Sequence, residues 1–129
     1  MTNMNAENQL SILVVDDDEV LGRILARVLQ QQGHAVRRAE NAAEALALAR
    51  DKTPHLVLVD LCLPVTDGVE LARQLRKEHP GIHLILMTAY PLRLRDQPSL
   101  AAGFNQVLTK PLGLAELRRA VDSTLALCG

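Results

Sequence analysis

Short apolar runs alternate along this chain with segments of helical periodicity, and this alternation limits the folds open to it. The runs are rich in the residues that strands favour, and they cover residues 12–15, 35–39, 56–59, 84–87 and 107–109. Between them, apolar side chains recur three and four positions apart, as they do on one face of a helix. Strict alternation of strand and helix predicts a parallel sheet with right-handed crossovers and helices on both faces.

The order of the strands follows from their polarity. The runs at 56–59 and 84–87 are apolar at every position, as is typical of central parallel strands, whereas the run at 35–39 carries Arg37 and Arg38 and reads as an edge. Five strands with the second at an edge suit a doubly wound, flavodoxin-like α/β/α fold of order 2-1-3-4-5. That fold places a ligand crevice at the carboxyl ends of its first and third strands.

The helical segments have recognisable ends. Asn41 and Glu44 form a cap pair for a helix over 42–50, and Gly33 ends the helix before it. The fourth helix falls in residues 91–104, where Pro98 would cost an amide bond and clash with the preceding turn, at about 3 kcal/mol. We therefore expect a short or broken fourth helix that restarts near Ser99.

Length and composition indicate one soluble domain. The chain has 129 residues, and we expect a flexible polar tail over 1–10 followed by a single domain over 11–129. A net charge of -1 and an aromatic content of 2% argue against direct binding of nucleic acid. There is no signal peptide and no membrane-length apolar stretch, so we expect no membrane contact, a cytoplasmic location and reduced thiols at Cys62 and Cys128.

Polar residues follow the predicted strands at their carboxyl ends. The stretch LVLVDLCLPVTDG runs four apolar residues into an aspartate, which by itself is as well explained by a strand end as by a nucleophile. Parallel strands end at one edge of a sheet, so the fold would gather all of these residues into one crevice. They are Asp16, Asp17, Asp18, Asp60, Thr88 and Lys110.

Several carboxylates in one crevice repel one another, by about 4 kcal/mol for each close pair at a surface-like dielectric. A divalent cation and Lys110 would offset this repulsion, and Mg²⁺ prefers an all-oxygen site with few carboxylates. The arrangement makes chemical sense as a phosphoryl-acceptor site. In it Asp60 is the nucleophile, Thr88 supplies a hydroxyl group, and Mg²⁺ and Lys110 stabilise the transferring group.

Four stretches together resemble the signatures of response-regulator receiver domains, the CheY-like phospho-acceptor domains of two-component systems. The stretches are VVDDD, LVLVDLCLPVTDG, LMTAY and LTKP, separated by 28 positions from Asp60 to Thr88 and by 22 from Thr88 to Lys110. The resemblance extends over about residues 12–127. It implies a phosphorelay domain that is not a conventional enzyme and that catalyses only its own phosphorylation and dephosphorylation.

The resemblance also implies roles for individual residues and for partners. Asp60 would take the phosphoryl group from a sensor histidine kinase or a histidine phosphotransfer protein. Asp17 would bind Mg²⁺ directly, Asp16 mainly through water, and Cys62 through its backbone carbonyl. The switched output would be a downstream protein target or an effector domain absent from this chain.

The resemblance also has implications for the residues at the ends of the last two predicted strands. Thr88 and Lys110 would each contact a phosphoryl oxygen, and Pro111 would follow a cis peptide bond that aims the lysine. Family members rotate an aromatic residue three positions before that lysine, where this chain has Val107. With Phe104 and Tyr90 displaced from that position, we expect the switch to be a backbone movement over 88–104. The switch region would comprise Thr88, Ala89, Tyr90, Phe104 and Val107.

Three other functions are compatible with parts of this pattern. A haloacid-dehalogenase-like phosphatase would need an acid where Cys62 stands, and a flavodoxin-like nucleotide binder would not carry acids after its first strand. A degenerate receiver that acts by phosphorylation-independent binding is the more serious alternative. Within the first motif, Asp17 or Asp18 is also placed to cap the first helix. Outside the motifs, His79 and His83 are interpreted as solvated loop histidines.

Overall fold

Five parallel strands form one sheet in the order β2-β1-β3-β4-β5, as predicted. The computed structural model describes residues 9–63 and 67–128, with side chains as far as residue 126. The predicted tail therefore lies outside the described residues except for Gln9 and Leu10, and Leu10 is buried in the core. The strands are β1 Ser11–Val15, β2 Ala35–Ala39, β3 Leu56–Asp60, β4 His83–Thr88 and β5 Gln106–Thr109.

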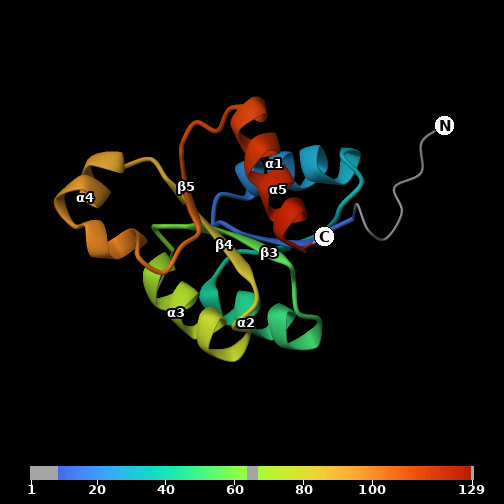
Figure 1. Ribbon diagram of the computed structural model, residues 1–129, viewed down its shortest axis with the longest axis horizontal. Helices are drawn as coiled ribbons and strands as arrows, with labels where there is room; N and C mark the ends of the chain where they lie inside the picture. The colour runs from blue at the N-terminus through green and yellow to red at the C-terminus, as the bar shows by residue number, and fades with distance from the viewer. Residues whose placement is uncertain (1–8, 64–66, 129) are drawn as a thin grey trace.

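Helices cover both faces of the sheet. In Figure 1, α1 and α5 lie together on one face and α2 and α3 on the other, while α4 projects to the side beyond β5. The helices are α1 Glu19–Gln31, α2 Ala42–Asp51, α3 Gly68–Glu78, α4 Pro91–Asp96, a 3₁₀ turn η2 Pro98–Ala101, and α5 Leu114–Cys128. No helix within residues 9–63 and 67–128 is long and apolar enough to cross a membrane.

Two apolar cores hold these layers together. One packs α1 and α5 onto the sheet through residues such as Leu29, Leu58 and Val121, and the other packs α2 and α3 through Leu13 and Leu71. All residues of β3 and β4 are buried, whereas β2 is partly exposed at the edge. Because the two sides of each central strand are covered, those strands read as unbroken apolar runs in the sequence.

Short polar side chains set where the first three helices begin. Asp18, and not Asp17, caps α1 by accepting a hydrogen bond from the Leu21 amide. At α2, Asn41 accepts from the Glu44 amide while the Glu44 carboxylate accepts from the Glu40 amide. The bond from the Glu44 amide to the Asn41 side chain confirms the predicted cap pair, and the bond from Glu40 ties Glu44 to the residue before the cap.

The fourth helix is short and broken, as predicted. α4 ends at Asp96, and the chain resumes as the 3₁₀ turn that starts at Pro98. Proline lacks the amide hydrogen that would continue α4, and its ring would collide with the preceding turn. Every residue of α4 and η2 is at least partly exposed.

The prediction for two histidines was wrong. His83 is the first residue of β4 and is buried, because the strand begins one position before the apolar run that marked it in the sequence. His79 ends α3 and is half-buried, with its Nδ1 atom 3.3 Å from the Thr53 hydroxyl oxygen. Both rings belong to the packed amino-terminal edge of the sheet.

Candidate phospho-acceptor site

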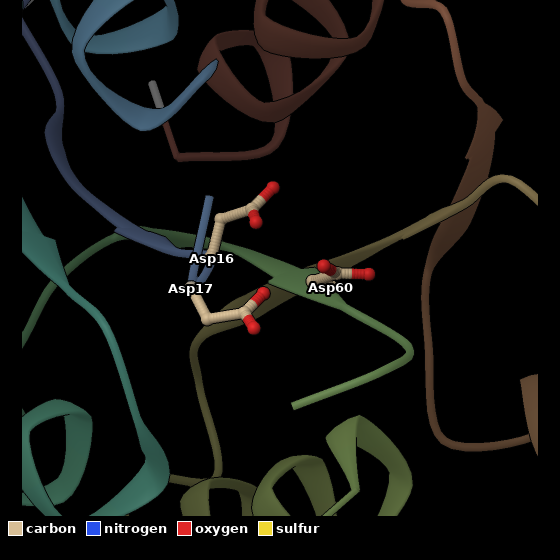
Figure 2. A group of neighbouring side chains, drawn as sticks. All are labelled: Asp16, Asp17 and Asp60. Atoms are coloured by element: carbon tan, nitrogen blue, oxygen red, sulfur yellow. The ribbon is translucent and has the colours of Figure 1, made fainter. Parts of the chain in front are cut away.

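Three aspartates meet at the carboxyl edge of the sheet. Asp16 and Asp17 follow β1, and Asp60 is the last residue of β3. Figure 2 shows their carboxyl groups gathered at the tips of these two strands. One oxygen from each lies within 4.8 Å of the others. The predicted crevice is therefore present, and it brings together carboxylates that are more than forty positions apart in sequence.

Lys110 joins the two buried carboxylates of this cluster. Its Nζ atom donates to Asp16 Oδ2 at 2.9 Å and to Asp60 Oδ2 at 3.2 Å, across 94 and 50 positions of sequence. Burial alone would lower the pKa of Lys110, but the hydrogen bonds and charges of Asp16 and Asp60 outweigh it and raise that pKa. The lysine is therefore a fixed cation that bridges β1 and β3.

Asp60 is a largely buried carboxylate with a raised pKa. Only 7% of the residue is exposed, and its other oxygen, Oδ1, accepts from the Cys62 amide at 3.2 Å. Burial and the charge of Asp16 raise the pKa of Asp60, against the opposing effects of the Cys62 amide and Lys110. A carboxylate that resists losing its proton is also more basic, and hence a better nucleophile once it is ionised.

Asp16 and Asp17 are held differently although they are adjacent. Asp16 is buried, and its two oxygens accept from Lys110 and from the Asp18 amide. Asp17 is exposed, and no hydrogen bond to its carboxylate is found among the described residues. Asp17 therefore has ligand oxygens to offer to a metal ion, whereas Asp16 is already engaged in positioning Lys110.

Thr88 and Lys110 are tied to each other through the backbone. Thr88 is fully buried, and its hydroxyl oxygen accepts from the Tyr90 amide at 2.8 Å. Its carbonyl oxygen accepts from the Lys110 amide at 2.8 Å. The Lys110–Pro111 peptide bond is cis, as predicted. The hydroxyl group and the ammonium group thus sit on neighbouring strand ends, β4 and β5, whose relative position is fixed.

Gly68 is a site residue that the sequence pattern indicates only as part of a turn. A Cβ atom at this position would lie 2.3 Å from the Asp60 carbonyl oxygen and 3.0 Å from Val59 Cγ1. Its amide donates to the Leu61 carbonyl at 3.0 Å. The start of α3 therefore rests directly on the backbone of Asp60. The pair Asp67 and Gly68 signals a helix start in the sequence, but a close approach across the chain leaves no local pattern.

The donor set fits a hard divalent cation. Three carboxylates and one ammonium leave a formal charge of -2, and every carboxylate offers oxygen. Cys62 lies at the mouth of the site with its thiol exposed, 4.0 Å from Nη1 of Arg93. Within the described residues, the cluster accounts for Asp16, Asp17 and Asp60 of the predicted metal ligands, and the role of the Cys62 carbonyl stays a prediction.

The predicted switch residues do not form one cluster. Tyr90 is 60% exposed and lines an apolar hollow of about 510 Å³ together with Ala89 and residues 91–93. Phe104 packs against the core on the α2 and α3 side. Val107 is 39% exposed on β5. Thr88 alone among the five lies in the site itself, and the Tyr90 amide is bonded directly to it.

Comparison with known proteins agrees with this geometry. The family model described as "Response regulator receiver domain" matches residues 12–122. A 14.6 kDa uncharacterized protein of Leptolyngbya boryana is 41% identical over 116 residues, which cover 88% of each chain. The transcriptional regulatory protein ResD of Bacillus subtilis is 34% identical over 122 residues, covering 95% of this chain and 50% of that protein. The chain therefore spans about half the length of that regulator.

A solved structure of a response regulator has a similar fold. The response regulator TrrA of Thermotoga maritima, crystallised in complex with Mg(2+)-BeF, superposes with a TM-score of 0.81 at 31% identity. The superposition covers 88% of this chain and 97% of that one. The chain belongs to the response-regulator receiver domains of two-component systems.

Proposed function

We propose that this receiver domain accepts a phosphoryl group on Asp60 from the phosphohistidine of a sensor kinase or a phosphotransfer protein. The observation that carries the proposal is the bridge from Lys110 to Asp16 and Asp60, next to the free carboxylate of Asp17. This bridge holds Oδ2 of Asp60 and the Cys62 amide holds Oδ1, so the carboxylate is fixed in position at the end of β3. This arrangement is better explained if Asp60 is a nucleophile than if it merely ends β3.

In the transfer step, a carboxylate oxygen of Asp60 attacks phosphorus and the phosphorus–nitrogen bond of the donor breaks. The donor imidazole leaves with the bonding electron pair and takes up a proton, so an acyl phosphate replaces the phosphohistidine. Lys110 stays protonated because its pKa is raised, and it can turn from the Asp60 carboxylate to a phosphoryl oxygen. Hydrolysis of the acyl phosphate later restores Asp60.

Mg²⁺ would be held by Asp17 and Asp60, by Asp16 through water, and by the Cys62 carbonyl. When bound, it supplies positive charge that offsets the repulsion between these carboxylates and the incoming phosphoryl oxygens. The donor set described above supports this assignment, as does the complex of the related TrrA with Mg(2+)-BeF.

We infer that Thr88 reports the phosphoryl group to the rest of the molecule. Its hydroxyl oxygen now accepts from the Tyr90 amide. Turning this hydroxyl group toward a phosphoryl oxygen would strain or break that bond and free the start of α4. We infer that the signal is a backbone movement over 88–104, because Val107 has no ring to swing.

The test is phosphorylation by acetyl phosphate in Mg²⁺, with the modified residue located by mass spectrometry. Wild type and Asp51→Asn should be labelled on Asp60, since Asp51 is an exposed residue at the end of α2. Asp60→Asn should not be labelled. If the Asp60→Asn variant is labelled as well as wild type, or if label in wild type is found on another residue, the proposal is wrong.

A further inference from the structure

All four histidines of the chain lie at the amino-terminal edge of the sheet, opposite the acidic site. His34 directly precedes β2, His55 directly precedes β3, His83 opens β4, and His79 ends the helix before it. Parallel strands begin at one edge, so the topology collects these side chains where β1 also begins. The phospho-acceptor chemistry makes no use of them.

Two of these rings bind the backbone where the chain enters β1. The Leu10 amide donates to Nδ1 of His34 at 3.0 Å, and the Ser11 amide donates to Nδ1 of His55 at 2.9 Å. A backbone hydrogen bond accompanies each of these contacts. The Ala35 amide donates to the Leu10 carbonyl, and the His55 amide donates to the Ser11 carbonyl. Consecutive amides of an extended chain point to opposite sides, so β1 is held toward β2 by one ring and toward β3 by the other.

Each of these bonds requires an unprotonated nitrogen. A backbone N–H can be donated only to the lone pair of Nδ1, so both rings are fixed as neutral imidazoles that carry hydrogen on Nε2. A proton on Nδ1 removes the acceptor, and the Nδ1–H group would then face the backbone N–H group, so that two donors would repel each other. For His34 it would also place a positive charge in a site that is 6% exposed.

The surroundings of the buried rings oppose protonation. Burial lowers the pKa of His34, against the attraction of Asp122 on α5, which faces it. Burial also lowers the pKa of His83, and the charge of Arg76 on α3 adds to this effect, while Gln106 on β5 lies 3.3 Å from its Nε2. Among the charges around these two rings in the described part of the chain, only Asp122 favours the protonated form.

The other two rings have different neighbours. His79 pairs with the Thr53 hydroxyl and adjoins Glu78, whose carboxylate is bonded to Arg50. His55 is exposed, and among the described residues no charged side chain is hydrogen-bonded to it. Of the four histidines, only His34 and His55 therefore bind the backbone of Leu10 and Ser11, where the chain enters β1.

We propose that His34 and His55 form a proton-operated latch that holds the start of β1 when both rings are neutral and releases it in mild acid. Release would free Leu10, a core side chain. The rest of β1 stays in place, because residues 12–15 are buried between two cores and paired on both sides. The latch thus makes one end of the strand sensitive to acid while the end that carries Asp16 remains ordered.

The pH range over which the latch opens is set by the pKa of a histidine in the folded and in the released state. A histidine in an unfolded or released segment binds a proton near pH 6.5, whereas His34 in the folded state does so at lower pH. The stabilisation that neutral His34 contributes is therefore fully present above about pH 6.5. It is lost as the pH falls from there toward the pKa of His34 in the folded state. Each proton taken up on opening raises the opening equilibrium constant about tenfold per pH unit.

The latch is tested by hydrogen exchange of single amides between about pH 8 and about pH 5, expressed as protection factors. Protection of Leu10 and Ser11 should fall on acidification while that of Val14 is unchanged. Asparagine places a carbonyl oxygen near the Nδ1 position and does not titrate. His34→Asn should therefore keep Leu10 protected in acid, His55→Asn should do so for Ser11, and His79→Asn should leave the wild-type pattern unaltered.

A measurement on the unaltered protein guards against a variant that fails to fold. Nitrogen chemical shifts of the imidazole rings should show Nδ1 of His34 and of His55 without hydrogen at neutral pH, and His34 still neutral below pH 6.5. The proposal is wrong if either ring carries hydrogen on Nδ1 at neutral pH. It is equally wrong if protection of Leu10 and Ser11 does not change with pH.

Discussion

The acidic edge of the sheet and the α4–η2 segment, residues 91–101, lie next to each other but are built differently. The acidic edge is carried by strands whose residues are all buried, and its charged groups are fixed by bonds from Lys110 to Asp16 and Asp60. The α4–η2 segment has every residue at least partly exposed, and Pro98 interrupts it. The two regions meet at Thr88 and Tyr90.

This difference separates two requirements of a receiver domain. Transfer of a phosphoryl group needs its participants held in fixed relative positions, which a buried sheet provides. Transmission of the signal needs a segment whose rearrangement costs little, and a segment with few buried contacts and few regular hydrogen bonds provides that. We therefore propose that the rigid region carries out the chemistry and that the loosely packed one transmits the signal.

The largest expected difference between the regions is in core packing. Leu58→Ala on β3 should lower the free energy of unfolding by about 3 kcal/mol, because the side chain is fully buried and a cavity would remain. Leu92→Ala on α4 should change it by less than about 0.5 kcal/mol, since Leu92 is exposed. Urea unfolding measures both values. Similar losses in the two variants would mean that α4 is packed as firmly as the sheet.

Alanine substitutions at two glycines should differ in their effect on stability, by less than the two leucine variants do. Gly68→Ala should destabilise the fold by about 2 kcal/mol and slow labelling of Asp60, because the new methyl group would displace the Asp60 backbone. Gly103→Ala is the matched control, since no atom lies within 4 Å of the Cβ position. It should stay within about 0.5 kcal/mol of wild type. A Gly68→Ala protein with wild-type stability and labelling would show that the backbone of Asp60 adjusts freely.

Metal binding should distinguish two residues of the rigid region itself. Asp17→Ala removes a free carboxylate and should weaken Mg²⁺ binding by about tenfold or more. Lys110→Ala removes no oxygen ligand and should leave Mg²⁺ affinity largely intact while impairing the response to phosphate. Titration of each variant with Mg²⁺ measures the affinities. Equal loss of affinity in both would contradict this division of roles.

Burial of Asp60, together with the charge of Asp16, predicts a pH dependence of stability. Because the pKa of Asp60 is raised, its protonated form stabilises the fold at low pH, and this contribution is lost as the pH rises through the folded pKa. Asp60→Asn should therefore be more stable than wild type in neutral buffer without Mg²⁺. The carbon chemical shift of the Asp60 carboxyl should titrate above the ordinary value of about 3.9. A midpoint below that value would show that Lys110 outweighs burial and Asp16.

Pro98→Ala should have the smallest effect on stability, within about 1 kcal/mol. It removes the obstacle between α4 and η2, so the helix should continue through residues 97–101. Carbon chemical shifts of the backbone report this directly. If these residues keep their 3₁₀ shifts in the variant, the interruption has a cause other than the proline.

Much of the rigid region could be predicted because its causes are local or topological. Unbroken apolar runs marked β3 and β4 as central, and the parallel order then placed Asp16, Asp60, Thr88 and Lys110 at one edge. The break at Pro98 could also be predicted, because proline acts on its own turn.

Other features depend on contacts between distant parts of the chain. The closeness of Gly68 to Asp60 arises only when α3 is laid on the end of β3. The burial of His83 and the bonds from Leu10 and Ser11 to two imidazoles likewise require the assembled edge of the sheet. The division of labour between Asp16 and Asp17 depends on which carboxylate Lys110 reaches, and sequence order does not reveal it.

The separation of chemistry from signalling is tested most directly by backbone amide chemical shifts in Mg²⁺, recorded with and without beryllofluoride, a mimic of the phosphoryl group. The account predicts changes at the ligands and large changes through residues 88–104, with residues 12–15 and 56–59 almost unaltered. Large changes confined to Val107 and its strand, with residues 88–104 silent, would contradict it.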